Sequence, residues 1–281
     1  MRRRSFLSAV GASAAALNAN PLRAGAAVTG AGRLKQGVSR WCFGKWSLDE
    51  LCANAVKLGI KGIDLIEPSD WPTVRKYGLV PSMTSGAGTI PDGWNRTENH
   101  ARLEQQMREN IARAAEAKVP NVITFSGNRR GQPDGEGMEN CAAGLKRIKA
   151  FAEEKNILVC IELLNSKVDH QDYQCDHTAW GVEVCKRVGS PRIKLLYDIY
   201  HMDIMEGDLI RTIRDNFACI GHFHTGGNPG RNEIDGTQET NYRAVAQAVA
   251  DLKFDGFFSH EFVPKKDPFQ SLQQAVEICT V

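Results

Sequence analysis

The sequence predicts a single-domain α/β protein, a (β/α)8 TIM barrel that spans residues 27–281. Short apolar runs alternate with amphipathic, helix-like segments, at about 30 residues for each of eight pairs, as this barrel requires. Several of the later runs end in an acidic residue or a histidine, and the carboxyl ends of the strands carry the chemistry of such barrels. An open doubly wound sheet is the main alternative, but its G-x-G-x-x-G turn is missing.

The composition is that of a globular domain with a large core. The chain has 281 residues, of which 42% are hydrophobic and 24% charged, enough for one large domain or two small ones. Lys and Arg number 35 against 33 Asp and Glu, a formal net charge of +2. This balance predicts neither a nucleic-acid partner nor a membrane surface.

Residues 1–26 contain the parts of an export signal. An arginine cluster at residues 2–4, followed by Phe6 and Leu7, precedes a short apolar stretch and the small-residue cleavage site at residues 24–26. The apolar stretch is shorter than the about 20 residues of a transmembrane helix. The segment resembles a bacterial twin-arginine (Tat) signal peptide, which implies the Tat export machinery as a partner and a periplasmic or exported protein after cleavage. A disordered basic N-terminus is the alternative.

Eight cysteines in an exported chain could form disulfides. However, four of them lie in apolar strand or helix patterns and are expected to be buried free thiols: Cys52, Cys160, Cys185 and Cys219. Cys42 and Cys175 lie in expected loops, and their pairing stays open. A structural zinc site is not indicated, because the chain has no C-x-x-C pair.

The first half of the expected barrel contains four strand–helix pairs. Ser47 and Glu50 form a capping box, which predicts the start of the first helix. In the third expected helix, apolar residues recur at helical spacing: Leu103, Met107 and Ile111. The expected strands are 36–39, 62–66, 79–84 and 121–125, and the expected helices are 47–58, 71–77, 98–117 and 138–155.

The second half is distinguished by how its strands end. Four apolar runs end at Glu162, Asp198, His224 and Glu261, respectively. Core packing does not explain a polar side chain at each of these positions. The helices expected after these strands are 178–188, 208–216, 242–252 and 268–279.

These four side chains predict a site for one divalent metal ion. Any one of them alone could be a solvated acid or a salt-bridge partner, but four separate structural reasons are improbable. Three carboxylates and one imidazole form a hard ligand set that suits Mn²⁺, Mg²⁺, Co²⁺ or Zn²⁺, and the absence of a thiolate argues against copper. Glu162 and Glu261 are the expected catalytic acid and base, because two carboxylates across a substrate could move a proton next to a carbonyl. That is the chemistry of sugar isomerisation and epimerisation.

Four segments carry a family resemblance: residues 161–165 (IELLN), 197–202 (YDIYHM), 221–224 (GHFH) and 259–262 (SHEF). Together they resemble the xylose-isomerase-like TIM-barrel superfamily of sugar isomerases and epimerases, and within it hydroxypyruvate isomerase. The resemblance implies one metal ion held by Glu162, Asp198, His224 and Glu261. It also implies that the two glutamates act as acid and base on a small carbohydrate or keto-acid substrate. The chain departs from the isomerase pattern at Asn232 and at His224, which leaves the substrate open.

Two further residues are candidates for substrate binding. His201, three residues after Asp198, could contact a substrate oxygen or support the metal ligands, or it could be an ordinary loop histidine. Arg231 could bind a substrate carboxylate or hydroxyl through two hydrogen bonds, or it could lie at the surface. Of the pair His222 and His224, only one is expected to face the barrel interior, and the resemblance selects His224.

Three other functions remain open. A lyase on oxidised (3-keto) sugars or glycosides would use the same proton abstraction. A phosphodiesterase would need about three zinc ions and more ligands than this chain's 7 histidines suggest. A non-catalytic sugar-binding protein would have no need of the four ligands. Assembly as a homo-oligomer is also open.

Overall fold

The computed structural model describes residues 32–281. The expected export signal, its cleavage and the start of the domain at residue 27 lie outside the described residues and stay predictions. Within residues 32–281, none of the helices is both long and apolar enough to span a bilayer.

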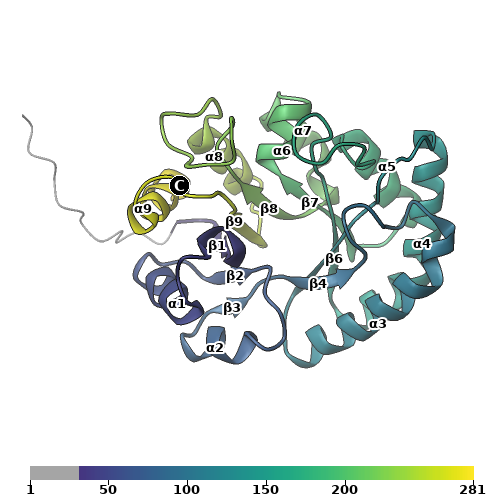
Figure 1. Ribbon diagram of the computed structural model, residues 1–281, viewed down its shortest axis with the longest axis horizontal. Helices are drawn as coiled ribbons and strands as arrows, with labels where there is room; N and C mark the ends of the chain where they lie inside the picture. Colours follow the sequence, from purple (N-terminus) through teal and green to yellow (C-terminus); the bar gives the residue numbers. More distant parts are fainter. Residues whose placement is uncertain (1–31) are drawn as a thin grey trace, which may run out of the picture.

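The described chain folds into one nearly closed parallel barrel, as expected (Figure 1). Its nine strands are β1 (Lys35–Ser39), β2 (Gly62–Asp64), β3 (Val80–Pro81), β4 (Thr84–Ala87), β5 (Asn121–Thr124), β6 (Leu158–Glu162), β7 (Ile193–Asp198), β8 (Ile220–Thr225) and β9 (Phe257–His260). Neighbouring strands follow the order β3-β2-β1-β9-β8-β7-β6-β5-β4.

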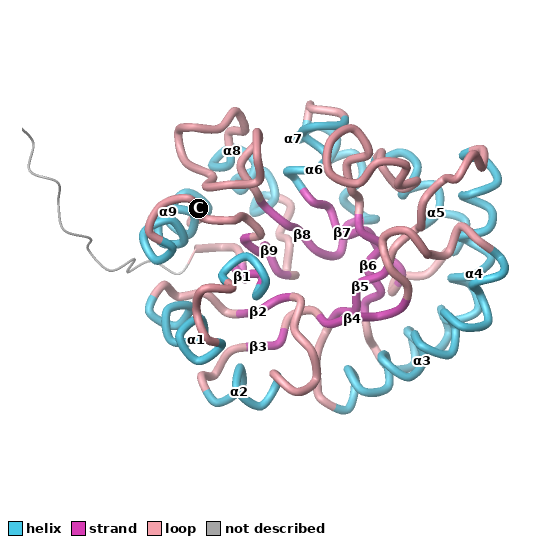
Figure 2. The backbone as a smooth tube through the Cα atoms, viewed as in Figure 1, coloured by secondary structure: helices cyan, strands magenta, loops and turns pink. Residues whose placement is uncertain are grey.

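Helices surround the strands on the outside of the barrel (Figure 2). The α-helices are α1 (Leu48–Lys57), α2 (Trp71–Lys76), α3 (His100–Glu116), α4 (Asp134–Lys155), α5 (Thr178–Val188), α6 (Ile199–Met205), α7 (Leu209–Asn216), α8 (Tyr242–Asp251) and α9 (Pro268–Cys279). Short 3-10 helices lie at η1 (Arg40–Phe43), η2 (Thr97–Asn99) and η3 (Phe217–Cys219). Ser47 and Glu50 form the predicted capping box of α1.

The strand expected at 79–84 is in fact shared between two neighbours. The N–H of Ser82 donates to the carbonyl of Ile63 at 2.9 Å, so this part of the chain follows β2. From Thr84 onward the chain pairs with β5 instead. Pro81 contributes to the change because it has no N–H to donate to a ladder. The ladder of the barrel is therefore interrupted at a seam between β3 and β4, where one continuous segment changes partners.

Three other expectations are corrected, and one open question is answered. Helix α6 was not expected, and α4 begins four residues before position 138. All eight cysteines are free thiols, so Cys42 and Cys175 do not pair. Cys219 lies in η3 rather than in a strand.

A small apolar layer fills the barrel interior below the strand ends. It consists of Met83, Ile123, Cys160 and Leu196. Because side chains two residues apart on a strand share a face, Glu162 lies on the same face as Cys160, and Asp198 on the same face as Leu196. The strand period thus directs both acids into the barrel above this layer. The larger apolar cluster includes residues of the sheet's other face and of the helices.

Candidate active site

The four predicted metal ligands converge at the carboxyl ends of four adjacent strands. Glu162 and Asp198 are the last residues of β6 and β7, His224 is the penultimate residue of β8, and Glu261 directly follows β9. One potential ligand atom from each residue lies within 4.8 Å of the others, and all four residues are buried. The structure therefore brings this predicted set together, while its role stays a prediction.

His224 lies between carboxylates on both sides of its ring. Its Nδ1 is 2.9 Å from Oε2 of Glu261 and 3.7 Å from Oε1 of Glu162. Its Nε2 is 3.2 Å from Oδ2 of Asp64. Burial by itself would lower the pKa of His224, but these three carboxylates outweigh it and raise the pKa above the ordinary value.

Arg231 supplies positive charge to the same cluster. Its guanidinium lies 3.0 Å from Oδ2 of Asp198 and also contacts Glu261. Its charged group lies over the rings of Trp41, at 5.3 Å, and Tyr200, at 5.5 Å. The alternative of a surface arginine is therefore wrong, because only 17% of this side chain is exposed.

The electrostatics of the cluster suit a bound cation. Burial, together with the neighbouring carboxylates of Glu261 and Glu162, raises the pKa of Asp198 to about 7 against the opposing effect of Arg231. Although Nδ1 of His224 is close to two carboxylates, it has no well-oriented hydrogen bond within residues 32–281. Three buried carboxylates and an imidazole nitrogen that still lacks a partner form a donor set that fits a hard divalent ion.

His201 also lies in the site, at the start of α6. Its backbone N–H donates to Oδ1 of Asp198 at 3.2 Å, so Asp198 is also the N-cap of α6. The Asn165 amide nitrogen lies 2.6 Å from Nδ1 of the His201 ring. Because that amide can only donate, we assign the ring proton to Nε2, which is 3.6 Å from Asp198. Burial lowers the pKa of His201, so the ring is neutral.

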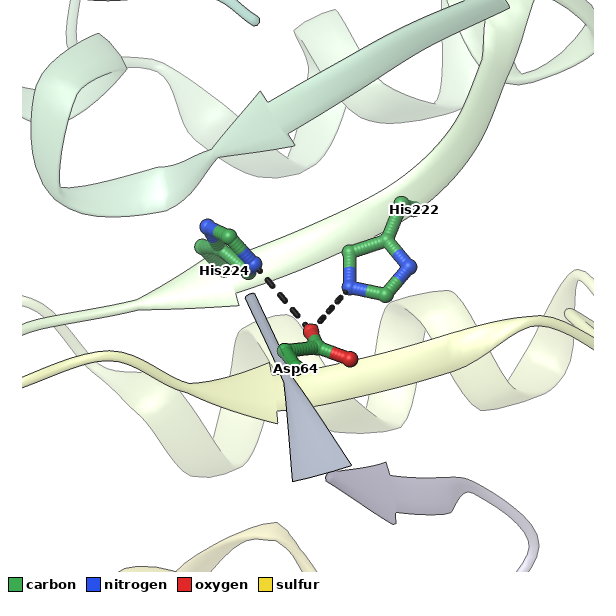
Figure 3. A group of neighbouring side chains, drawn as sticks. All are labelled: Asp64, His222 and His224. Atoms are coloured by element: carbon green, nitrogen blue, oxygen red, sulfur yellow. Dashed lines mark hydrogen bonds and ion pairs between the residues drawn. The ribbon is translucent and has the colours of Figure 1, made fainter. Parts of the chain in front are cut away.

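Three residues of the site were not among its predicted members. Trp41 donates its indole N–H to Oε1 of Glu261 at 2.7 Å. Asp64 and His222 form a second buried cluster with His224 (Figure 3). Asp64 ends β2, so an acid at the end of a short apolar run was a usable signal here too.

The expectation that only one of His222 and His224 faces the interior is wrong. Both side chains point to Asp64 from the same strand (Figure 3). The physical reason is the strand period of two, which places residues i and i+2 on the same face.

Comparison with known proteins agrees with the fold. The family described as xylose isomerase-like TIM barrel matches residues 52–279. The chain belongs to this family. Members of the family typically depend on a divalent metal ion, and the Glu162, Asp198, His224 and Glu261 cluster is the candidate site for one here.

The relatives within the family are isomerases that share low sequence identity with this chain. The hydroxypyruvate isomerase of Escherichia coli is 26% identical over 79% of this chain and 90% of its own length. The 2-oxo-tetronate isomerase of Cupriavidus necator is 32% identical over 41% of this chain and 43% of its own length. The chain spans about half the length of two vertebrate relatives, 50% of the one from Danio rerio and 55% of the one from Homo sapiens.

Solved structures confirm the fold alone. An AP endonuclease, family 2, from Brucella melitensis has a TM-score of 0.74 at 20% identity, over 86% of this chain and 97% of the other. The 3-keto-D-glucoside 4-epimerase of Escherichia coli has a TM-score of 0.72 at 18% identity, over 87% of this chain and 98% of the other.

Proposed function

We propose that this chain is a divalent-metal-dependent isomerase or epimerase, acting by proton transfer next to a carbonyl of a small sugar or keto acid. The observation that carries the proposal is the arrangement of Glu162 and Glu261. They come from different strands, are buried, and approach the same imidazole, His224, with ligand atoms within 4.8 Å of each other. The family membership and the isomerase relatives support the reaction class.

Glu162, Asp198, His224 and Glu261 would hold the ion. A divalent ion bound there supplies positive charge that stabilises the negative oxygen of an enediolate. The guanidinium of Arg231 already balances part of the same carboxylate charge through Asp198 and Glu261.

The two glutamates differ in how tightly they are held. The Glu261 carboxylate accepts hydrogen bonds from Trp41 and Arg231 and lies 2.9 Å from His224. The Glu162 carboxylate has only the 3.7 Å contact with His224 among the interactions of the described residues. We therefore assign Glu162 as the freer base, which takes the proton from carbon, and Glu261 as the restrained partner, which returns it to the neighbouring carbon.

Two groups are placed to bind the substrate. The Arg231 guanidinium suits a carboxylate or a pair of hydroxyls. The Nε2–H of His201 has no hydrogen-bond partner within the described chain and can donate to a substrate oxygen. A 2-keto acid of three or four carbons, as the names of the two bacterial isomerases indicate, satisfies both groups.

Solvent-deuterium exchange tests this function. Protein reconstituted in turn with Mn²⁺, Mg²⁺, Co²⁺ and Zn²⁺ is incubated in D₂O with hydroxypyruvate, a 2-oxo-tetronate and ketohexoses, and deuterium at the carbon next to the carbonyl is measured by NMR. We expect deuterium exchange with at least one combination of metal and substrate, and we expect that exchange to be lost when the metal is chelated. Glu162→Gln and Glu261→Gln should each slow it by about 10²–10⁴-fold. Metal content is measured for each variant, because both residues are also ligands.

A matched control is Glu183→Gln on the exposed side of α5, which loses only a surface ion pair with Arg187 and should exchange at the wild-type rate. Loss of a leaving group instead of isomer formation would assign the lyase. Binding of substrates with no exchange under any metal would contradict the proposal and favour a sugar-binding protein.

A further inference from the structure

Asp64 is a fully buried carboxylate in the half of the barrel opposite the metal ligands. Oδ2 of Asp64 lies 2.6 Å from Nε2 of His222 and 3.2 Å from Nε2 of His224 (Figure 3). Its other oxygen, Oδ1, accepts a hydrogen bond from the Ser82 hydroxyl. A buried acid with this many partners is not a solvated strand end, and the catalytic scheme above leaves it unused.

The contacts fix which nitrogens carry protons. An ionised carboxylate can only accept, so both imidazoles donate Nε2–H to Asp64. At His222 the other nitrogen, Nδ1, lies 3.5 Å from the amide nitrogen of Asn121, which can only donate. Both His222 contacts therefore require the same tautomer, with the proton on Nε2.

The same assignment has a consequence at His224. With Nε2 donating to Asp64, Nδ1 keeps its lone pair whenever the ring is neutral, and Nδ1 is the nitrogen that faces Glu162 and Glu261. A histidine that ligates a metal through one nitrogen usually donates from the other to a carboxylate, which orients the ring.

We propose that Asp64 is a positioning residue, which fixes the tautomer and ring plane of His224 so that Nδ1 faces the metal site, while His222 holds Asp64 in place. The inference rests on the proposed metal site and adds two residues from outside its ligand set.

A second metal ion between Asp64, His222 and His224 is the competing interpretation of the same cluster. Ligand nitrogens about 2.0–2.1 Å from a tetrahedral ion lie about 3.3 Å from one another. The 2.6 Å separation between His222 and Asp64 is well below this value and is that of a strong hydrogen bond. The geometry therefore favours hydrogen bonding over a second ion.

Metal affinity of Asp64→Asn, measured by titration with Mn²⁺ or Zn²⁺, tests the proposal. The amide keeps the shape but cannot accept from both rings as an anion does, so we expect metal affinity to fall by about 10–100-fold. The matched control is Asp176→Asn, which removes another buried carboxylate that accepts hydrogen bonds, from Arg129 and Ser166, away from the cluster. The control should bind metal like the wild type.

The tautomers are read directly in the wild type, with no variant that could fail to fold. In ¹⁵N-histidine-labelled protein, NMR should show protons on Nε2 of both His222 and His224 without metal, and Zn²⁺ bound to Nδ1 of His224 when loaded. Zn²⁺ on Nε2 of His224, two ions per chain with His222 as a ligand, or unchanged affinity in Asp64→Asn would overturn the proposal. If the wild type binds no metal, the proposed function fails, while the metal-free spectrum still tests the Asp64 bonds.

Discussion

The two halves of the barrel contribute different groups to the candidate site. Strands β6 to β9 each end at or beside a potential metal ligand, whereas β1, β4 and β5 end in Ser39, Ala87 and Thr124. The first half instead supplies groups that contact those ligands: Trp41 hydrogen-bonds to Glu261, and Asp64 to His224. One half thus holds the four potential ligands, and the other supplies side chains that contact them.

The difference follows the continuity of the sheet. In the strand order, β8 with His224 lies in the middle, and the seam between β3 and β4 forms the two edges. The ligands therefore lie on strands paired on both sides. The two strands at the seam, β3 and β4, carry none of the four ligands, so an interrupted ladder there leaves the ligands in place. The comparison predicts that changes to the ligands, or to the groups that contact them, affect metal and catalysis, while changes to apolar side chains at the seam affect mainly stability.

The largest expected effect on stability is from Arg231→Ala. Removing the guanidinium takes a buried positive charge away from both the Asp198 and the Glu261 carboxylates, so we expect the metal-free protein to lose about 3–5 kcal/mol of unfolding free energy. Because a bound ion supplies replacement charge, saturating Mn²⁺ should raise Tm more in the variant than in the wild type. Thermal and urea unfolding with and without metal measure both.

Arg187→Ala is the matched control, since its ion pair with Glu183 is exposed and worth about 0–1 kcal/mol. An equal metal-induced rise in Tm for Arg231→Ala and the wild type would mean that the guanidinium and the ion do not balance the same charge.

The second half of the site could be predicted from the sequence because each ligand ends an apolar run of several residues. Asp64 was missed because the strand was predicted to run to residue 66, which placed this acid inside it, whereas β2 ends at Asp64. Helix α6 was missed because Asp198 has two roles: it ends β7 and also caps the helix that follows without a loop. The barrel as a whole was predictable, since its short apolar runs and their alternation with helix-like segments are local signals.

The long-range contacts were not predictable. Nothing near Trp41 in the chain indicates that it meets Glu261, 220 positions away, and the exchange of strand partners at Thr84 depends on β2 and β5 together. Such contacts are set by barrel closure, which brings the N-terminal strand beside the last one.

Met83→Ala tests the seam. Met83 is fully buried between β3 and β4 and packs in the interior apolar layer. Loss of its side chain leaves a cavity and should cost about 2–5 kcal/mol of stability in urea unfolding. Met83 packs in the same layer as Cys160 of β6 and Leu196 of β7, but the four ligands lie above this layer and keep their own polar contacts, so metal affinity should change little. A parallel loss of metal affinity would break the division between the two halves.

The smallest effect is expected from Trp41→Phe, which removes one hydrogen bond across the halves. Trp41 is 48% exposed, so little packing is lost, and a phenyl ring can still lie against Arg231. The indole N–H to the Glu261 carboxylate is a hydrogen bond to a charged group, worth about 1.5 kcal/mol at this exposure. If it orients Glu261 for proton return, deuterium exchange should slow about tenfold with metal affinity nearly unchanged. Trp46→Phe is the control, since Trp46 stacks on Phe43 and should exchange normally. Equal rates in both variants would show that the first half positions His224 alone and leaves Glu261 to Arg231.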